Sequence, residues 1–344
     1  MSNRRGVGVI GLGMASLPHA KSLLDLADKV EVHGVYSPSA DRRRQFSETF
    51  GFPSVNSVED IANDDRIAAV LVLTPPNARF DVVELLASRG KHILMEKPVE
   101  RSLAAATQLV ELCERHAVKL GLVFQHRFRD ASIALKEQLV AGHLGRISAV
   151  QISVPWWRNQ SYYDEPGRGS YERDGGGVMI SQAIHTLDLT LNLVGPVQSV
   201  TAMAGTTSFH QMESEDFVAG ALRFENGAIG SLMATTASFP GSTESITLHA
   251  EHATAVLQGG DLSIAWHDGR SIQVGETAGS GGGSDPMDFP HDWHLRLIDQ
   301  FLQSLDSDEV SVSGREGLLV HRLIDMLERS SDSEMHVKTT ASES

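Results

Sequence analysis

A histidine and an aspartate lie on one side of a helix expected over residues 177–194. At about 100° per residue, Ser181, His185, Asp188 and Asn192 fall within about 60° of arc. The neighbouring face is apolar and carries Ile180, Ile184, Leu187, Leu191 and Val194. A histidine with an unperturbed pKa of about 6.5 can accept a hydroxyl proton near neutral pH. The alternative is a structural histidine bonded to Asp188 or Ser181, and the stripe by itself favours that alternative.

A lysine follows a strand expected over residues 92–95, within the sequence Glu96-Lys97-Pro98. In parallel α/β sheets, ligands bind at the carboxyl ends of the strands. There Lys97 could hydrogen-bond a substrate oxygen, relay its proton and stabilise developing alkoxide charge. The alternative is a surface lysine after a strand, but the adjacent proline and the place at the ligand edge favour the functional interpretation.

Two glycines follow an apolar strand expected over residues 7–10. Gly11, Gly13 and Met14 would let a pyrophosphate approach the backbone at the N-terminus of the next helix. Ser16 stands where the dinucleotide-binding pattern has its third glycine, so a plain strand-to-helix turn remains the alternative.

The strand expected over residues 30–36 ends without the carboxylate that NAD-binding proteins use to bond the ribose hydroxyls. Ser37 takes that place, and Arg42 or Arg43 could reach a 2′-phosphate from the following helix. These residues favour NADP over NAD. The alternative is NAD held less specifically beside a solvated helix start.

Aromatic and basic residues are concentrated over residues 154–174. Aromatic faces stack on sugar rings, and arginine binds hydroxyl or carboxylate groups. Arg158, Tyr162 and Tyr163 are therefore candidate substrate contacts, and Arg127 could reach the same pocket. An anionic or heavily hydroxylated substrate is suggested by five arginines in an acidic protein: Arg127, Arg129, Arg158, Arg168 and Arg173. The alternative is an aromatic loop that seals a domain interface.

The order of the expected elements changes along the chain. Helices alternate with continuously apolar strands over the first third, which predicts a parallel sheet covered on both faces. After about residue 145 strand follows strand, and Asn226-Gly227 and Asp268-Gly269 predict hairpins. We expect an α/β Rossmann domain over residues 1–124 and an α+β domain with a large, mostly antiparallel open sheet over residues 125–344. The Gly/Ser-rich stretch 277–286 is expected to be a surface loop.

Composition excludes several kinds of partner. The 344 residues carry a formal net charge of −15, which argues against nucleic acid and anionic membrane surfaces. The single cysteine, Cys113, allows no disulfide within the chain and fits a reducing compartment, so we expect a cytoplasmic protein. His291 and His294 open a late helix and could line the pocket or cap the helix; we predict no metal site.

Five stretches resemble the glucose–fructose oxidoreductase/inositol dehydrogenase/rhizopine catabolism (Gfo/Idh/MocA) family. They are "LMEKPVE", "VLTPPNARF", "FQHRFR", "GGGVMISQAIHTLDL" and "WWRNQSYYDEPGRG". The resemblance implies a Rossmann domain followed by a substrate-binding and oligomerisation domain whose sheet joins subunits, as a homodimer or homotetramer. It also implies hydride transfer between NAD(P) and a carbinol carbon of a sugar, sugar derivative or cyclitol.

The resemblance assigns roles to individual residues. It implies that Lys97 and His185 are catalytic, and that Ser181 and Gln182 contact substrate together with His185. Cofactor contacts are implied for the turns after the strands, at Thr74, Pro75, Asn77, Glu96 and Lys97. Two positions depart from the common family pattern: Ser181 replaces an aspartate, and Phe80 replaces a histidine.

We therefore predict an NAD(P)-dependent oxidoreductase that acts on a secondary alcohol or ketone of a carbohydrate or cyclitol. Two alternatives remain open. One is an NAD-dependent glycosidase that oxidises its substrate transiently. The other is a non-catalytic dinucleotide-sensing protein.

Overall fold

The computed structural model describes residues 4–275, 289–307 and 309–339. They form two compact units. The first unit contains the described residues up to Gln125 together with 291–318, and the second contains 126–290 and the residues from Leu319 onward. The sequence predicts a second domain that runs without interruption from residue 125, whereas here residues 291–318 pack with the first unit. The Gly/Ser-rich stretch 277–286 lies outside the described residues.

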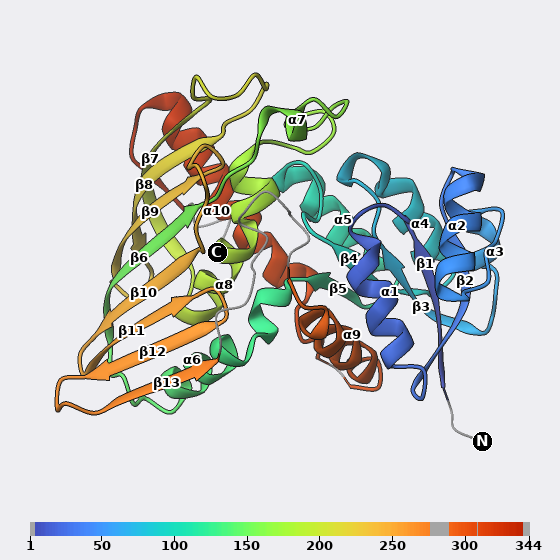
Figure 1. Ribbon diagram of the computed structural model, residues 1–344, viewed down its shortest axis with the longest axis horizontal. Helices are drawn as coiled ribbons and strands as arrows, with labels where there is room; N and C mark the ends of the chain where they lie inside the picture. The colour runs from blue at the N-terminus through green and yellow to red at the C-terminus, as the bar shows by residue number, and fades with distance from the viewer. Residues whose placement is uncertain (1–3, 276–288, 308, 340–344) are drawn as a thin grey trace. The chain divides into compact units, whose positions relative to one another are not determined.

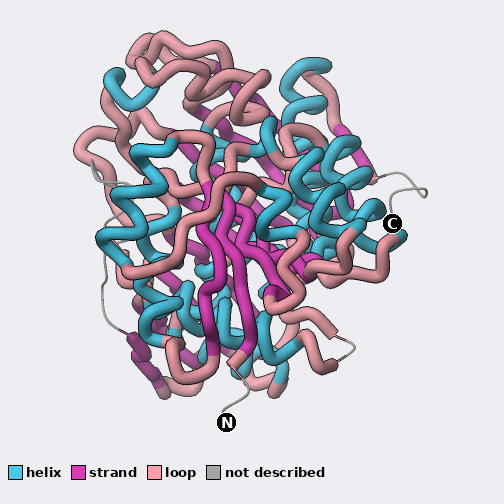
Figure 2. The backbone as a smooth tube through the Cα atoms, turned by 90° about the vertical axis from the view of Figure 1, so that its right-hand side faces the viewer, coloured by secondary structure: helices cyan, strands magenta, loops and turns pink. Residues whose placement is uncertain are grey.

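The first unit is built on a five-stranded parallel sheet in the order β2-β1-β3-β4-β5. The strands are β1 (Arg5–Ile10), β2 (Val30–Tyr36), β3 (Ile67–Val72), β4 (His92–Glu96) and β5 (Leu120–Val123). Helices lie to either side of the sheet, as Figure 2 shows. The helical elements are α1 (Ser16–Asp25), α2 (Ala40–Phe50), α3 (Val58–Ala62), η1 (Pro76–Ala78), α4 (Phe80–Ser88), α5 (Leu103–Arg115) and α9 (Asp292–Ser304). Apart from the edge strand β2, which is partly exposed, the strands are almost wholly buried, because both faces of the sheet are covered.

Helix α9 belongs to the first unit although it lies far along the chain. Its apolar side chains recur at helical spacing, and it packs against α1 and β5. The fit is close at Gly121, where an added Cβ would lie 2.5 Å from the ring of Phe301. Only glycine at this point of β5 leaves room for the Phe301 ring.

The second unit is built on a nine-stranded sheet in the order β13-β12-β11-β10-β6-β9-β8-β7-β14. Its strands are β6 (Ile147–Pro155), β7 (Val197–Gly205), β8 (Phe217–Phe224), β9 (Ile229–Thr235), β10 (Ser245–Ala250), β11 (Ala253–Gln258), β12 (Asp261–Trp266), β13 (Ser271–Gly275) and β14 (Val337–Lys338). All neighbours pair antiparallel except β6 and β9, which are parallel. The predicted hairpins at Asn226-Gly227 and Asp268-Gly269 join β8 to β9 and β12 to β13, and both glycines have positive φ.

Helices cover one face of the large sheet. They are α6 (Asp130–Val140), α8 (Ile184–Val194) and the later part of α10 (Gly314–Ser333); α7 (Gln160–Tyr163) lies in a loop (Figure 1). Among the described residues, no helix covers the opposite face. A parallel Rossmann sheet and a large, mostly antiparallel sheet confirm the predicted fold class. Of the described helices, none is long and apolar enough to cross a membrane.

Candidate active site

The turn from β1 to α1 leaves its backbone open to a ligand. Gly11 has φ +99°, and an added Cβ would lie 2.7 Å from the carbonyl carbon of Leu73, so the turn requires glycine there. At Gly13 an added Cβ would meet nothing within 4 Å. Met14 next to it is half exposed. Ala15 is the N-cap residue of α1, and no side chain hydrogen-bonds the helix N-terminus there. The backbone N–H groups of the first turn are therefore not occupied by a side-chain cap and could bind an anion.

Ser16 takes over the place of the missing third glycine. Its side chain is 3% exposed, and its hydroxyl donates to the carbonyl of Gly13 at 2.6 Å. The serine therefore stabilises the tight turn from within. Such a turn, with an uncapped helix end and an open glycine, fits the pyrophosphate of a dinucleotide held by Gly11, Gly13 and Met14.

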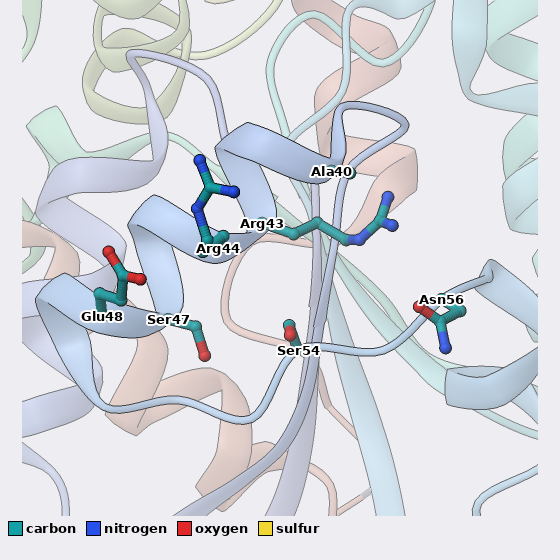
Figure 3. A pocket seen from close by; sticks show the side chains of 7 residues that line it. All are labelled: Ala40, Arg43, Arg44, Ser47, Glu48, Ser54 and Asn56. Carbon is teal, nitrogen blue, oxygen red and sulfur yellow. The ribbon is translucent and has the colours of Figure 1, made fainter.

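The end of β2 combines a buried serine with exposed arginines. Ser37 is 2% exposed, and its carbonyl accepts a hydrogen bond from Arg43 at 2.6 Å. Ser39 caps α2 by accepting from the backbone N–H of Arg42 at 3.3 Å. A hollow of about 420 Å³ lies beside α2, shown in Figure 3. Its lining consists of Ala40, Arg43, Arg44, Ser47, Glu48, Ser54 and Asn56. Arg43 thus lines a hollow beside the β2 end, whereas Arg42 does not.

A buried arginine joins the two loops that follow β3 and β4. Arg79 is 2% exposed, donates to the carbonyl of Thr74 from Nε at 2.9 Å and Nη2 at 2.7 Å, and also bonds the carbonyl of Pro98. Burial lowers the pKa of Arg79 to about 10, although the nearby carboxylates of Glu96 and Glu100 oppose this shift. Arg79 is not among the residues that the sequence predicts for the site. A local indication is its place inside "TPPNARF", the stretch that follows β3 at the ligand edge of the sheet.

The lysine at the end of β4 leaves the sheet beside a cis peptide bond, between Lys97 and Pro98. The Lys97 backbone N–H donates to the carboxylate of Glu96 at 3.2 Å. Thr74, Pro75 and Asn77 lie at the end of the neighbouring strand β3. The first unit therefore places the glycine turn, the β3 loop and Lys97 at the carboxyl edge of one sheet, as the sequence predicts.

The last of the three glycines before the second-unit helix, Gly177, is explained by Glu215. Its carboxylate accepts the backbone N–H groups of Gly177 and Met179, each at 3.0 Å. An added Cβ on Gly177 would lie 1.8 Å from the Glu215 carbonyl oxygen. Burial raises the pKa of Glu215, although these two N–H groups oppose the rise. The carboxylate thus caps the start of the helix, and only glycine can approach it so closely.

The helix expected over residues 177–194 is not uniform. Residues Met179–Ala183 form a π-helical turn, η3, and α8 begins only at Ile184. A π turn widens the helix, so the 100° wheel that places Ser181 in line with His185 does not hold across it. Such turns occur often at functional sites. Both Ser181 and Gln182 lie within the turn.

His185 is buried and stacks against a second histidine. Its ring is 6% exposed, and its centroid lies 4.8 Å from that of His126. Asp188, one turn further, forms a two-pronged ion pair with Arg127, at 2.8 Å to Nε and 2.7 Å to Nη2. The guanidinium predicted as a substrate contact is therefore bound to a buried carboxylate. This placement supports a role for Arg127 in holding the helix that carries His185.

The predicted substrate contacts in the aromatic loop divide into two groups. Arg158 and Arg168 stack on the ring of Tyr162, at 5.5 and 4.2 Å from its centroid, and Gln182 donates to the Tyr162 hydroxyl at 3.3 Å. Tyr163 instead points inward: its ring is 7% exposed and its hydroxyl lies 2.7 Å from that of Thr236. Arg158, Tyr162 and Gln182 thus come together, while Tyr163 has the surroundings of a packing residue.

Two further histidines raised by the sequence lie in the first unit. His291 pairs with Asp25 at 2.7 Å near the surface. His294 is 2% exposed and contacts the ring of His19 at a centroid distance of 4.9 Å. Neither caps α9. The pairing of His19 with Glu96 is not predicted from the sequence, because 77 positions separate the two residues.

Two family models match most of the chain. Residues 5–124 match the model described as "Oxidoreductase family, NAD-binding Rossmann fold", and residues 133–256 match "GFO/IDH/MocA C-terminal domain".

Individual relatives agree with these matches. Myo-inositol 2-dehydrogenase of Thermotoga maritima is 27% identical over 65% of this chain and 66% of its own length. The scyllo-inositol 2-dehydrogenase (NADP(+)) IolW of Bacillus subtilis is 26% identical over 57% of this chain and 53% of its own. The chain thus matches about two thirds or less of the length of these relatives. The WlbA dehydrogenase of Bordetella pertussis, solved with NADH and UDP-GlcNAcA, is 27% identical with a TM-score of 0.83 over 98% of this chain and 99% of that one.

Proposed function

Because the chain belongs to the Gfo/Idh/MocA oxidoreductase family, we propose that it transfers a hydride between a nicotinamide dinucleotide and a secondary alcohol or ketone of a sugar, sugar derivative or cyclitol. The observation that carries the proposal is the carboxyl edge of the first-unit sheet. The turn at Gly11 and Gly13 lies there, followed by the N-terminus of α1, which has no side-chain cap. Lys97, the residue after β4, belongs to the same unit. A dinucleotide bound at this edge supplies the hydride acceptor or donor.

The roles of the two catalytic candidates follow from their chemistry. In alcohol oxidation, His185 takes the hydroxyl proton, and Lys97 hydrogen-bonds the same oxygen and stabilises its developing charge. In ketone reduction both act in reverse. The proposal requires both side chains to reach one substrate carbon.

We further propose NADP as the preferred cofactor. Ser37 presents no carboxylate to repel a 2′-phosphate, and Arg43 lines the hollow beside α2. Arg42 is exposed at the start of the same helix. The remaining cofactor contacts, from Thr74, Pro75, Asn77, Glu96 and Lys97, stay predictions.

An anionic or heavily hydroxylated substrate is supported by the aromatic loop. Arg158 is 3% exposed and is held between Trp156 and Tyr162, so its charge has a fixed position. Gln182 reaches the same tyrosine. We assign these residues, with Ser181 and His185, to the substrate.

The proposal is tested by titrating the protein with NADH and NADPH and then following nicotinamide absorbance with sugars, cyclitols and uronates. We expect tighter binding of NADPH, weakened in Arg43→Ala while NADH binding is unchanged, and a substrate-dependent net absorbance change. Aglycone release without net absorbance change would identify the glycosidase alternative. Nucleotide binding without turnover across the panel would identify the sensing protein.

We also propose that the protein forms a homodimer or homotetramer through the second-unit sheet, in the cytoplasm. The strand registers place uncharged side chains in rows across its uncovered face. One row contains Ser245, Ser153, Met233, Ala219 and Met203, and the next contains Thr247, Gln151, Ser231, Ala221 and Thr201. A face of small, uncharged side chains of this kind suits a second copy of the same sheet.

Ser231→Glu should therefore reduce the oligomer to monomers, because two copies would bring buried carboxylates together. Ser231 is exposed in the single chain, so folding of the subunit should not change. Light scattering after size-exclusion chromatography measures the mass. Ser88→Glu, on an exposed position of α4, is the matched control. A wild-type protein that elutes as a monomer contradicts the proposal.

A further inference from the structure

The side chain of Glu96 is held inside the first unit by two hydrogen bonds. One carboxylate oxygen lies 2.8 Å from Nε2 of His19, and the other accepts the backbone N–H of Lys97 at 3.2 Å. Glu96 is 8% exposed and His19 is 1% exposed. Both oxygens thus have partners within the protein, which favours a role inside the fold over the cofactor contact that the sequence predicts.

A third buried group supports this pair. The ring of His294, on α9, meets that of His19 edge to face at 4.9 Å, and burial lowers the pKa of His294 to about 3. His294 is therefore neutral at working pH. Burial by itself would raise the pKa of Glu96, but the hydrogen bond from His19 and the charges of His19 and Lys97 lower it overall. The result is an ionised carboxylate with a fixed position on the residue before Lys97.

The same three side chains raise the question of a metal. Their potential ligand atoms all lie within 4.8 Å of one another. Nε2 of His19 lies only 2.8 Å from the Glu96 carboxylate, which is the distance of a direct hydrogen bond. This contact favours a hydrogen-bonded pair with a packed neighbour over a coordination sphere.

We propose that Glu96 and His19 are positioning residues for Lys97. His19 fixes the carboxylate of Glu96, and this carboxylate fixes the backbone N–H of Lys97, the residue that carries the lysine side chain. Since His19 lies on α1, the helix whose N-terminus forms the dinucleotide turn, the pair also links that turn to the lysine. The inference rests on the proposed function, in which Lys97 acts on the substrate oxygen.

The test compares His19→Leu and the isosteric Glu96→Gln with His19→Gln, which retains a side-chain N–H donor. We expect His19→Leu to lower kcat about tenfold or more, with the Kd for dinucleotide within about twofold of wild type, and His19→Gln to recover most of the loss. Glu96→Gln should move the lysine-dependent limb of the kcat pH profile to lower pH, because a nearby negative charge favours the ammonium form. Should His19→Leu not fold, Glu96→Gln provides the measurement.

A matched control exists on the same two helices. His291, on the α9 side, also bonds a carboxylate of α1, that of Asp25, but it is not part of the Glu96 cluster. His291→Leu should leave kcat and the pH profile unchanged.

A second readout does not depend on turnover. The rate at which an amine-reactive label modifies Lys97, followed by peptide mass spectrometry, should change at least threefold in His19→Leu and Glu96→Gln, and not in His291→Leu. If labelling of Lys97 changes in His19→Leu and Glu96→Gln but the wild-type protein turns over no substrate, the proposed function fails and the positioning role stands. Wild-type labelling and kcat in both variants would overturn the positioning role. Submicromolar zinc binding that is lost in His19→Leu would also overturn it, in favour of a metal site.

Discussion

Lys97→Met should lower kcat by about 10²- to 10⁴-fold, with little change in the Kd for dinucleotide. The methionine keeps the length of the side chain but can neither donate a hydrogen bond nor carry charge to a developing alkoxide. The measurement is the initial rate of nicotinamide absorbance change at saturating cofactor, with the substrate that the wild type uses best. His185→Gln should show a loss of the same order, because it removes the proton acceptor.

Each variant has a control on the surface of its own unit. Lys21→Met changes an exposed lysine of α1, and His143→Gln changes an exposed histidine bonded to Gln138. Neither should alter turnover. If Lys97→Met and His185→Gln both retain wild-type kcat, the assignment of catalytic roles is wrong.

Arg129→Met should destabilise the protein by about 3–5 kcal/mol. Arg129 and Glu244 form an ion pair at 2.7 Å with side chains only 2% and 4% exposed, and Arg129 also donates to the carbonyl of Gly259. The second oxygen of Glu244 accepts from the Trp156 indole at 3.2 Å. Without the guanidinium, a buried carboxylate loses its counter-charge. Urea denaturation should report the loss in the free energy of unfolding.

The double variant Arg129→Met/Glu244→Gln separates this cause from lost packing. It removes the uncompensated charge and should recover a large part of the stability. Arg270→Met breaks an exposed pair with Asp268, of which the side chains are 71% and 55% exposed, and should leave the free energy of unfolding nearly unchanged. Equal losses in the single and double variants would show that the charge is not the cause.

Local sequence pattern predicts the strands and helices well, because turn residues mark where each of these elements begins and ends. The strand at 30–36 has in the structure the limits that the sequence indicates. Apolar runs between turn residues are sufficient for that. The π turn over Met179–Ala183 is not visible in the helical spacing, and the carboxylate that caps the start of this helix belongs to Glu215, 36 positions beyond Met179.

Side-chain partners are harder to predict than elements. The arginines that suggested an anionic substrate include Arg127, Arg129 and Arg173, which pair with Asp188, Glu244 and Glu165. The first two partners lie 61 and 115 positions away, beyond any local pattern. Arg158 and Tyr162 remain together because they belong to one short loop.

The return of residues 291–318 to the first unit decides how this chain can be divided. A gene fragment that stops at residue 125 would encode every strand of the Rossmann sheet, yet it would leave Gly121 without the Phe301 ring that packs against it and His19 without the ring of His294. Exchange of the nucleotide-binding half between relatives must therefore transplant two separate stretches of chain.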